Sequence, residues 1–100
     1  MILQLTADAL RDLAEYALFV AASDHVAAAR ETERLREDIK RFALLPADGR
    51  PVRIKGVKEP VRRWSLPPFI VYYKREPDKL IVLRIYHHAR RPIERAPTRR

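Results

Sequence analysis

The segment FIVYYKREPDKLIVLRIYHH, residues 69–88, decides the fold of this chain. Both halves of the segment are dense in β-branched and aromatic residues, which favour strands. Between them lies Glu76-Pro77-Asp78-Lys79, a composition typical of a turn. Two strands joined by so short a turn predict a hairpin with strands over residues 69–75 and 80–88. The unbroken apolar run at 80–83 predicts that the second strand is buried on both faces at its start.

Shorter strands are predicted outside this hairpin. One spans residues 61–66 and is followed by the interrupting pair Pro67-Pro68. Another is indicated by apolar residues that alternate with basic ones over residues 52–58. The mainly apolar residues 1–5 indicate a strand at the start of the chain.

Residues 6–44 show helical periodicity instead. The first helix is expected to have Thr6 or Asp8 as its cap and to bury the face formed by Leu10, Leu13, Ala14, Ala17, Leu18 and Ala21. Ser23-Asp24 interrupts the pattern and can cap a second helix over residues 25–44, which ends before Pro46. The inner face of this second helix is predicted to be Ala28, Thr32, Leu35, Ile39 and Phe42. The short connection between them predicts a helical hairpin.

The order of these elements predicts an α+β fold, in which an N-terminal strand and a helical hairpin pack on one face of a small, mostly antiparallel C-terminal sheet. The length of 100 residues indicates one domain, expected over residues 1–92, with a basic flexible tail over residues 93–100. The core between hairpin and sheet is predicted to be Leu13, Ala17, Leu35, Ile39, Phe42, Val71, Leu83 and Ile85. The opposite sheet face is expected to be open to water or to a partner.

The charge of the chain is unevenly distributed. Residues 1–48 carry 6 basic and 9 acidic side chains, a net −3, whereas residues 49–100 carry 15 basic and 4 acidic side chains, a net +11. Such a basic half is typical of proteins that meet nucleic acid, an acidic protein segment or a membrane surface. A solubilising charged surface is the simpler alternative.

Several function classes are excluded by composition. The chain has no cysteine, which rules out disulfides, a thiol nucleophile and cysteine-ligated zinc, and fits a reducing cytoplasm. Its two glycines cannot form a phosphate-binding loop, and no apolar run approaches the ~20 residues that span a bilayer. His87 and His88 are adjacent on a strand and therefore point to opposite faces, so we expect no metal site. No cofactor and no membrane contact are expected.

The last strand carries the residue types of an acid–base site. Arg84, Tyr86 and His88 share one face by their alternation, and His87 faces the helices or the rim. Histidine could transfer protons during RNA cleavage while arginine holds the phosphate. A purely structural role for these residues remains the favoured alternative. Trp64 beside Arg62 and Arg63 is interpreted in the same way, as a sheet anchor more than a platform for stacking bases.

The segment VRRWSLPPFIVYYKREPDKLIVLRIYHHARRP, residues 61–92, resembles the C-terminal half of toxins of the RelE/ParE superfamily. The last strand of those toxins follows the type I-x-V-L-R-V-L-H-G-A-R, and residues 81–90 here resemble it, with His88 in place of the usual glycine. FIVYYK resembles the family's YxxxYR strand. The helical hairpin and the connector, Leu45-Pro46 followed by residues 49–52, match in type and order.

This resemblance implies a toxin that is neutralised by a cognate antitoxin. In the ParE branch such a toxin inhibits DNA gyrase by binding, whereas the RelE branch cleaves mRNA on the ribosome. The ending LRIYHHARRP is more similar to ParE, and Phe69 stands where a related RNase carries arginine. We therefore expect no catalytic residues. The alternatives are a RelE-like endoribonuclease and a non-toxic, basic nucleic-acid-binding module. In the RelE-like case the catalytic candidates are Arg84, Tyr86, His87 and His88.

The residues expected to meet target and antitoxin are Arg62, Arg63, Arg84, His87, Arg90 and Arg91. Arginine suits this role because its planar fork matches carboxylate and phosphate groups. Surface ion pairs with Glu59 or Glu94 are the alternative explanation, although such pairs stabilise by only about 0–1 kcal/mol.

Overall fold

The computed structural model describes residues 2–45 and 48–87. Its elements are β1 (Ile2–Leu5), α1 (Ala7–Ala21), α2 (His25–Ala43), β2 (Arg50–Val52), β3 (Val61–Leu66), β4 (Phe69–Glu76) and β5 (Lys79–His87). The predicted elements are present, except that the strand expected over 52–58 is short and lies earlier, as β2. His88, Arg90, Arg91 and the predicted tail over residues 93–100 lie outside the described residues.

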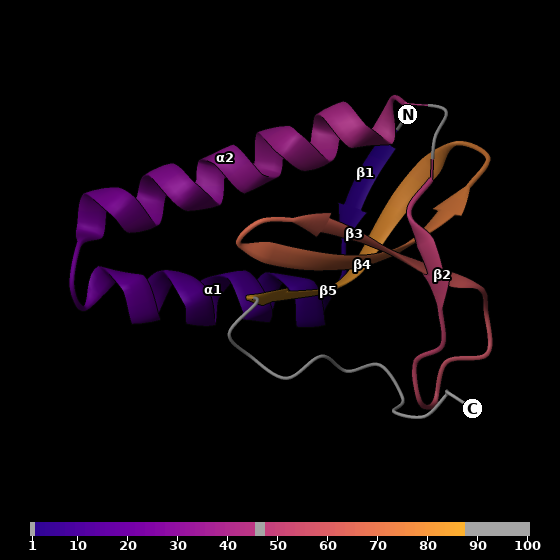
Figure 1. Ribbon diagram of the computed structural model, residues 1–100, viewed down its shortest axis with the longest axis horizontal. Coiled ribbons are helices and arrows are strands. Elements are labelled where there is room, and N and C mark those ends of the chain that lie inside the picture. Colours follow the sequence, from indigo (N-terminus) through magenta and orange to yellow (C-terminus); the bar gives the residue numbers. More distant parts are fainter. Residues whose placement is uncertain (1, 46–47, 88–100) are drawn as a thin grey trace.

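The strands form one five-stranded sheet in the order β1-β5-β4-β3-β2. β1 runs parallel to β5, and the other three pairs are antiparallel. The two helices lie side by side as a hairpin, joined at the end of the molecule farthest from β2 (Figure 1). The predicted α+β fold, with a helical hairpin on one face of a mostly antiparallel sheet, is confirmed.

Both helices begin at a side-chain cap, as their sequences predict. Asp24 Oδ1 accepts a hydrogen bond from Ala27 N–H at 3.0 Å. Thr6 Oγ1 accepts from Ala9 N–H at 3.1 Å and donates to the carbonyl oxygen of Leu83 at 2.9 Å. Each cap satisfies an amide of the first helical turn. Thr6 also attaches the start of α1 to β5.

The core between hairpin and sheet contains most of the predicted residues. Leu13, Leu35, Ile39, Val71 and Ile85 are buried in it, and Phe42 packs against its margin. The largest group of side chains that the prediction missed is aromatic: Trp64, Phe69 and Tyr73. The prediction for Ala17 is wrong, because this residue is only half-buried and lies outside the cluster.

The other sheet face holds a second, smaller cluster. Val61, Ile70 and Tyr72 are buried there, and the residues packed against them are Val52, Ile54, Val57, Leu83 and Tyr86. Two of these, Ile54 and Val57, belong to the connection between β2 and β3. This part of the sheet is therefore covered, whereas the sequence predicted an open face.

Leu83 lies in this second cluster and not in the predicted core. A β-bulge explains the error, since Tyr72 pairs with Arg84 whereas Tyr73 pairs with Val82. Leu83 is thus an extra residue in β5, and the alternation of faces shifts at that point. As a result Val82 and Ile85, three positions apart, both face the helices.

The predicted buried face of α1 is also partly wrong. Leu10 is 50 % exposed and Leu18 is 74 % exposed. The face that meets the sheet contains Ala9 and Leu13 together with Asp12, and Tyr16 packs against its margin. Polar contacts of Asp12, described below, fix this rotation of the helix.

The two faces of the hairpin give a direct test of the packing. Ile39→Ala is expected to lower the free energy of unfolding by about 2–5 kcal/mol, because Ile39 is 1 % exposed and its truncation leaves a cavity. Leu18→Ala should change it by no more than about 0.5 kcal/mol. Urea unfolding of both variants measures the difference, and equal effects would contradict the assigned faces.

Candidate partner-binding site

Asp12 of α1 and Arg84 of β5 form a two-point ion pair. Arg84 Nε lies 2.8 Å from Asp12 Oδ2, and Arg84 Nη2 lies 3.0 Å from Asp12 Oδ1. The Asp12 side chain is 7 % exposed and that of Arg84 is 33 % exposed. The hydrogen bond to Asp12 raises the pKa of Arg84 above its ordinary value, against the opposing effect of burial. The geometry is the planar fork that arginine makes with a carboxylate.

The same carboxylate completes the edge of the sheet. β1 pairs with β5 only as far as Leu5 and Val82, after which the chain turns into α1. Beyond that point the Ile85 amide donates to Asp12 Oδ2 at 2.9 Å. The Asp12 carboxylate thus takes the place of the main-chain carbonyl that a longer β1 would offer as an acceptor. It satisfies the buried Ile85 N–H.

His87 faces the helices, as predicted for one histidine of the pair. Its ring stacks on Tyr16 with centroids 5.3 Å apart, and Phe69 meets Tyr16 edge-on at 4.8 Å. The Tyr16 hydroxyl donates to Glu31 of α2. Burial, with the hydrogen bond and the charge of Glu31, raises the pKa of Tyr16 to about 12. These contacts tie the end of β5 to both helices.

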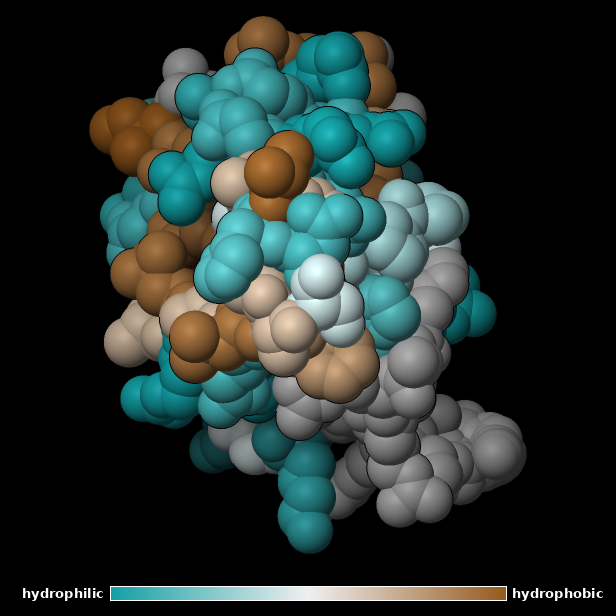
Figure 2. Space-filling model, turned by 90° about the vertical axis from the view of Figure 1, so that its left-hand side faces the viewer, coloured by the Kyte–Doolittle hydropathy of each residue, from teal (hydrophilic) through white to brown (hydrophobic). Residues whose placement is uncertain are grey.

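A cavity of about 310 Å³ opens beside this aromatic group, lined by Asp12, Glu15, Tyr16, Phe19, Phe69, Ile85 and His87. Its walls are mainly apolar. Phe19, on its rim, is 77 % exposed, and Leu18 and Val26 nearby on the hairpin are 74 % and 69 % exposed. Figure 2 looks onto this end of the molecule and shows brown apolar patches among the polar surface. Large exposed apolar groups gathered in this way are typical of a protein-binding surface.

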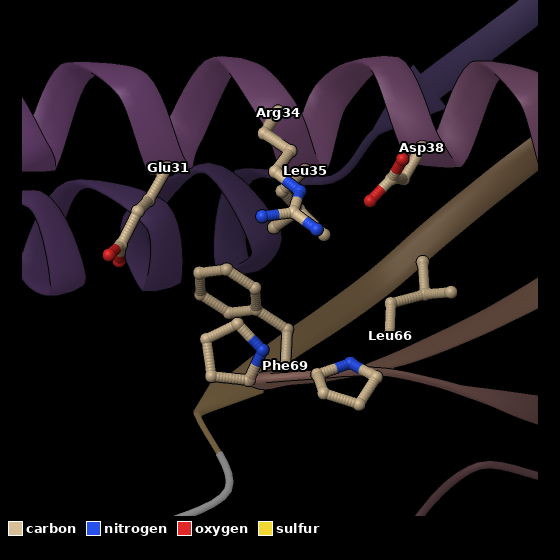
Figure 3. Close-up of a pocket in the computed structure, with 8 residues that line it drawn as sticks. Glu31, Arg34, Leu35, Asp38, Leu66 and Phe69 are labelled. Carbon is tan, nitrogen blue, oxygen red and sulfur yellow. The ribbon is translucent and has the colours of Figure 1, made fainter.

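A second groove lies between α2 and the β3–β4 turn and holds about 70 Å³. Glu31, Arg34 and Asp38 extend from α2 toward Leu66 and Phe69 (Figure 3). It is too small for a nucleotide, and its rim carries both signs of charge. It therefore shows no preference for an anionic ligand.

Of the predicted arginines, the three within the described residues, Arg62, Arg63 and Arg84, do not form one cluster. Arg62 Nη1 donates to the Gly49 carbonyl at 2.8 Å, on the side of β3 that faces the helices. Arg63 points to the opposite side, where it lies across from Arg50 of β2. β4 separates both from Arg84 on β5. Trp64 is 6 % exposed and stacks on Tyr73 with centroids 4.0 Å apart, which confirms its role as an anchor.

The candidates for RNA chemistry are likewise dispersed. Arg84 is held by Asp12 and lies 4.8 Å from the Tyr86 ring centroid, whereas His87 is on the other side of the strand, against Tyr16. His88 lies outside the described residues. Within residues 2–45 and 48–87, no three His, Asp or Glu side chains are grouped so that they could hold a metal ion. Neither helix of this part of the chain is long and apolar enough to cross a membrane.

Two contributors to this site were missed in the sequence. The sequence patterns described above predict no role in a site for either Asp12 or Tyr16. Their signal was present in the spacing, because Ala9, Asp12, Leu13 and Tyr16 follow one another by three, one and three positions along a helix face. An aspartate within such a face needs a partner, and Arg84 is a cation directly after the apolar run of residues 80–83.

Removal of the Asp12 carboxylate should destabilise the protein strongly. Asp12→Ala leaves Arg84 and the Ile85 amide without this acceptor, so we expect the free energy of unfolding to fall by about 2–4 kcal/mol. Asp8→Ala is the matched control, because it breaks an exposed Asp–Arg pair on the same helix and should cost under about 1 kcal/mol. Denaturant titrations compare the two, and a similar small loss for both would show that the buried pair is not structural.

Comparisons with known proteins match this fold. The family model described as ParE toxin of the type II toxin–antitoxin system parDE matches residues 3–92. The protein Y4kP of Sinorhizobium fredii (strain NBRC 101917 / NGR234), named as a candidate toxin, is 34 % identical over 87 residues, which are 87 % of this chain and 88 % of that protein.

A solved structure shows the same arrangement of elements. A chain from the chromosomal ParDE system of P. aeruginosa aligns with a TM-score of 0.71 and 24 % identity, covering 87 % of this chain and 95 % of the other. The match supports the fold, and the family match spans nearly all of the sequence. The chain belongs to the ParE toxin family of type II toxin–antitoxin systems.

Proposed function

We propose that this chain is the toxin of a type II module, that it inhibits DNA gyrase by binding and that a cognate antitoxin neutralises it. Membership of the ParE toxin family supports the toxin role. Gyrase acts on chromosomal DNA, so the proposed place of action is the cytoplasm. The solved relative is described as part of a ParDE system, which supports an antitoxin as the partner.

The fixed position of Arg84 is the observation that carries the choice of binding over catalysis. In an RNase this guanidinium would have to face a phosphate, but here it makes two hydrogen bonds to Asp12. His87 packs against Tyr16 and Phe69 on the other side of β5. A general base must be within hydrogen-bond reach of the reacting group that the cation stabilises. These two side chains do not converge on one such position.

The cavity beside α1 is the proposed docking position of the antitoxin. Phe19 on its rim is 77 % exposed, and Leu18 and Val26 extend the apolar surface along the hairpin. An amphipathic antitoxin segment could insert apolar side chains there while its carboxylates meet nearby arginines. The opposite charges would also steer the association, since the toxin has a net charge of +8.

The proposed contact residues for target and antitoxin are Arg62, Arg63, Arg84 and His87, together with Arg90 and Arg91 beyond the described residues. Because β4 separates β3 from β5, we assign them to two patches. His87 belongs to the patch at the docking cavity. Arg63 belongs to the basic surface of β2 and β3.

The target is tested first by inducible expression of the chain in bacteria. Separate assays then measure whether the purified chain inhibits DNA supercoiling by gyrase and whether it cleaves mRNA on ribosomes. We expect growth arrest, loss of supercoiling and intact mRNA. His87→Gln should retain toxicity, because His87 belongs to the docking cavity proposed for the antitoxin and the proposed mechanism transfers no proton. If the wild-type chain cleaved mRNA at fixed positions within codons and His87→Gln did not, the protein would belong to the RNase branch instead. Normal growth on expression would indicate a non-toxic module.

The docking position is tested by two equally exposed apolar residues. Phe19→Ser should weaken antitoxin binding by about 30-fold or more, the range of an aromatic hot spot, without changing the unfolding midpoint. Leu44→Ser is the control, because Leu44 is 76 % exposed but lies at the other end of the hairpin. Calorimetric titration with the antitoxin measures both. Equal losses, or unchanged binding by Phe19→Ser, would place the antitoxin elsewhere.

A further inference from the structure

The segment from β2 to β3 is the most basic continuous part of the described chain. Residues 50–63 contain one carboxylate, Glu59, and six cations: Arg50, Arg53, Lys55, Lys58, Arg62 and Arg63. Glu59 interacts with Lys74 of β4, whose Nζ lies 3.4 Å from Glu59 Oε2. The carboxylate nearest in sequence is thus already engaged by another cation. The segment, which we call the basic connection, has a net charge of +5 from six positive and one negative side chain.

The basic connection is held in place from within. Val52, Ile54 and Val57 turn inward and pack against the second apolar cluster. The Val57 amide donates to the Ile54 carbonyl at 3.0 Å, and Gly56 allows the turn with a φ of 86°. In Figure 1 the connection lies at the side of the sheet away from the α1–α2 turn. The intervening cations are therefore presented on an anchored support.

The cations face solvent around a concave surface. Arg53, Lys55 and Lys58 are exposed, and a hollow of about 350 Å³ is lined by residues 52–60. Its lining is mainly polar. Arg53 follows the end of β2 and Lys55 lies in the turn after it, so both cations can meet anionic groups of one ligand at this hollow.

The strands at the two ends of this segment add further positive charge. Arg50 of β2 is the direct cross-strand partner of Arg63 of β3, and residues in this position share a sheet face. Two guanidinium groups on one face raise the local positive potential, which favours the approach of an anionic ligand.

The side chains that accompany the cations indicate which class of anionic ligand fits this surface. Residues 50–63 contain no aromatic side chain, and the next residue, Trp64, is buried. Single-stranded nucleic acids are typically held by aromatic side chains that stack on the bases. An acidic protein segment typically adds apolar anchors, but the apolar residues here point inward. Regularly spaced phosphates of a duplex need only cations.

We infer that the basic connection binds the phosphate backbone of double-stranded DNA without sequence preference. The inference does not depend on the identity of the toxin's target, and it gives the chain a second binding surface distinct from the apolar end of the hairpin. Arg53, Lys55 and Lys58 are the primary contacts. Arg50 and Arg63 add to the local potential.

The test measures binding of the full-length chain to a short fluorescent DNA duplex by anisotropy over a series of NaCl concentrations. Each phosphate contact contributes about 0.9 to the slope of log K against log salt. The variant Arg53→Ala/Lys55→Ala/Lys58→Ala should therefore lower the slope by about 2.7 and weaken binding at low salt. The control Arg30→Ala/Arg34→Ala/Arg36→Ala removes the same charge from exposed positions of α2 and should leave the slope nearly unchanged.

Several outcomes would overturn the inference. The wild-type chain could fail to bind the duplex at low salt, or the two triple variants could lose equal slope, which would indicate a diffuse effect of net charge. Tighter binding of the single strand than of its duplex would contradict phosphate recognition. Loss of antitoxin affinity with unchanged DNA binding would make the connection a protein site. Circular dichroism and urea unfolding of both variants separate a loss of contact from a loss of fold.

Discussion

The buried carboxylate of Asp12 is the constraint on which the arrangement of this protein depends. It joins a helix to a strand 72 positions away and satisfies both a guanidinium and a main-chain amide. A charged group with 7 % side-chain exposure is stable only when its partners are in place. This requirement fixes the rotation of α1, and with it the positions of Tyr16 against His87 and of Phe19 on the rim of the cavity.

The rotation of α1 explains why two leucines of this helix are exposed while an aspartate is buried. Periodicity alone would bury Leu10 and Leu18, yet both are exposed while an aspartate is inside. Burial of two leucines would contribute roughly 1.5–3 kcal/mol each. The fold instead keeps an apolar surface available at the end of the hairpin. Exposed apolar surface of this kind is typical of proteins that bind a partner.

Much of the fold could be predicted from the sequence, because its strongest signals are local. Caps at Thr6 and Asp24 and the turn after β4 depend on neighbouring residues alone. The errors concern Leu18, Ala17 and Leu83, whose environments depend on distant partners or on a change in strand register. The site was predicted least well, because the partner of Arg84 and the stacking of Tyr16 on His87 join segments far apart in the chain.

The bulge at Leu83 has a consequence for how this strand can change over evolution. Which sheet face each later residue of β5 occupies, counted along the strand from the earlier residues, depends on the extra position at the bulge as well as on the chemistry of its side chain. Deletion of one residue there would restore regular pairing with β4 and leave the later residues on their present faces, because Ile85 already pairs with Val71 and faces the helices. A deletion in the regular part of the strand would instead exchange the interior and surface residues on one side of it. The bulge is therefore a position at which β5 can change its length and keep its core.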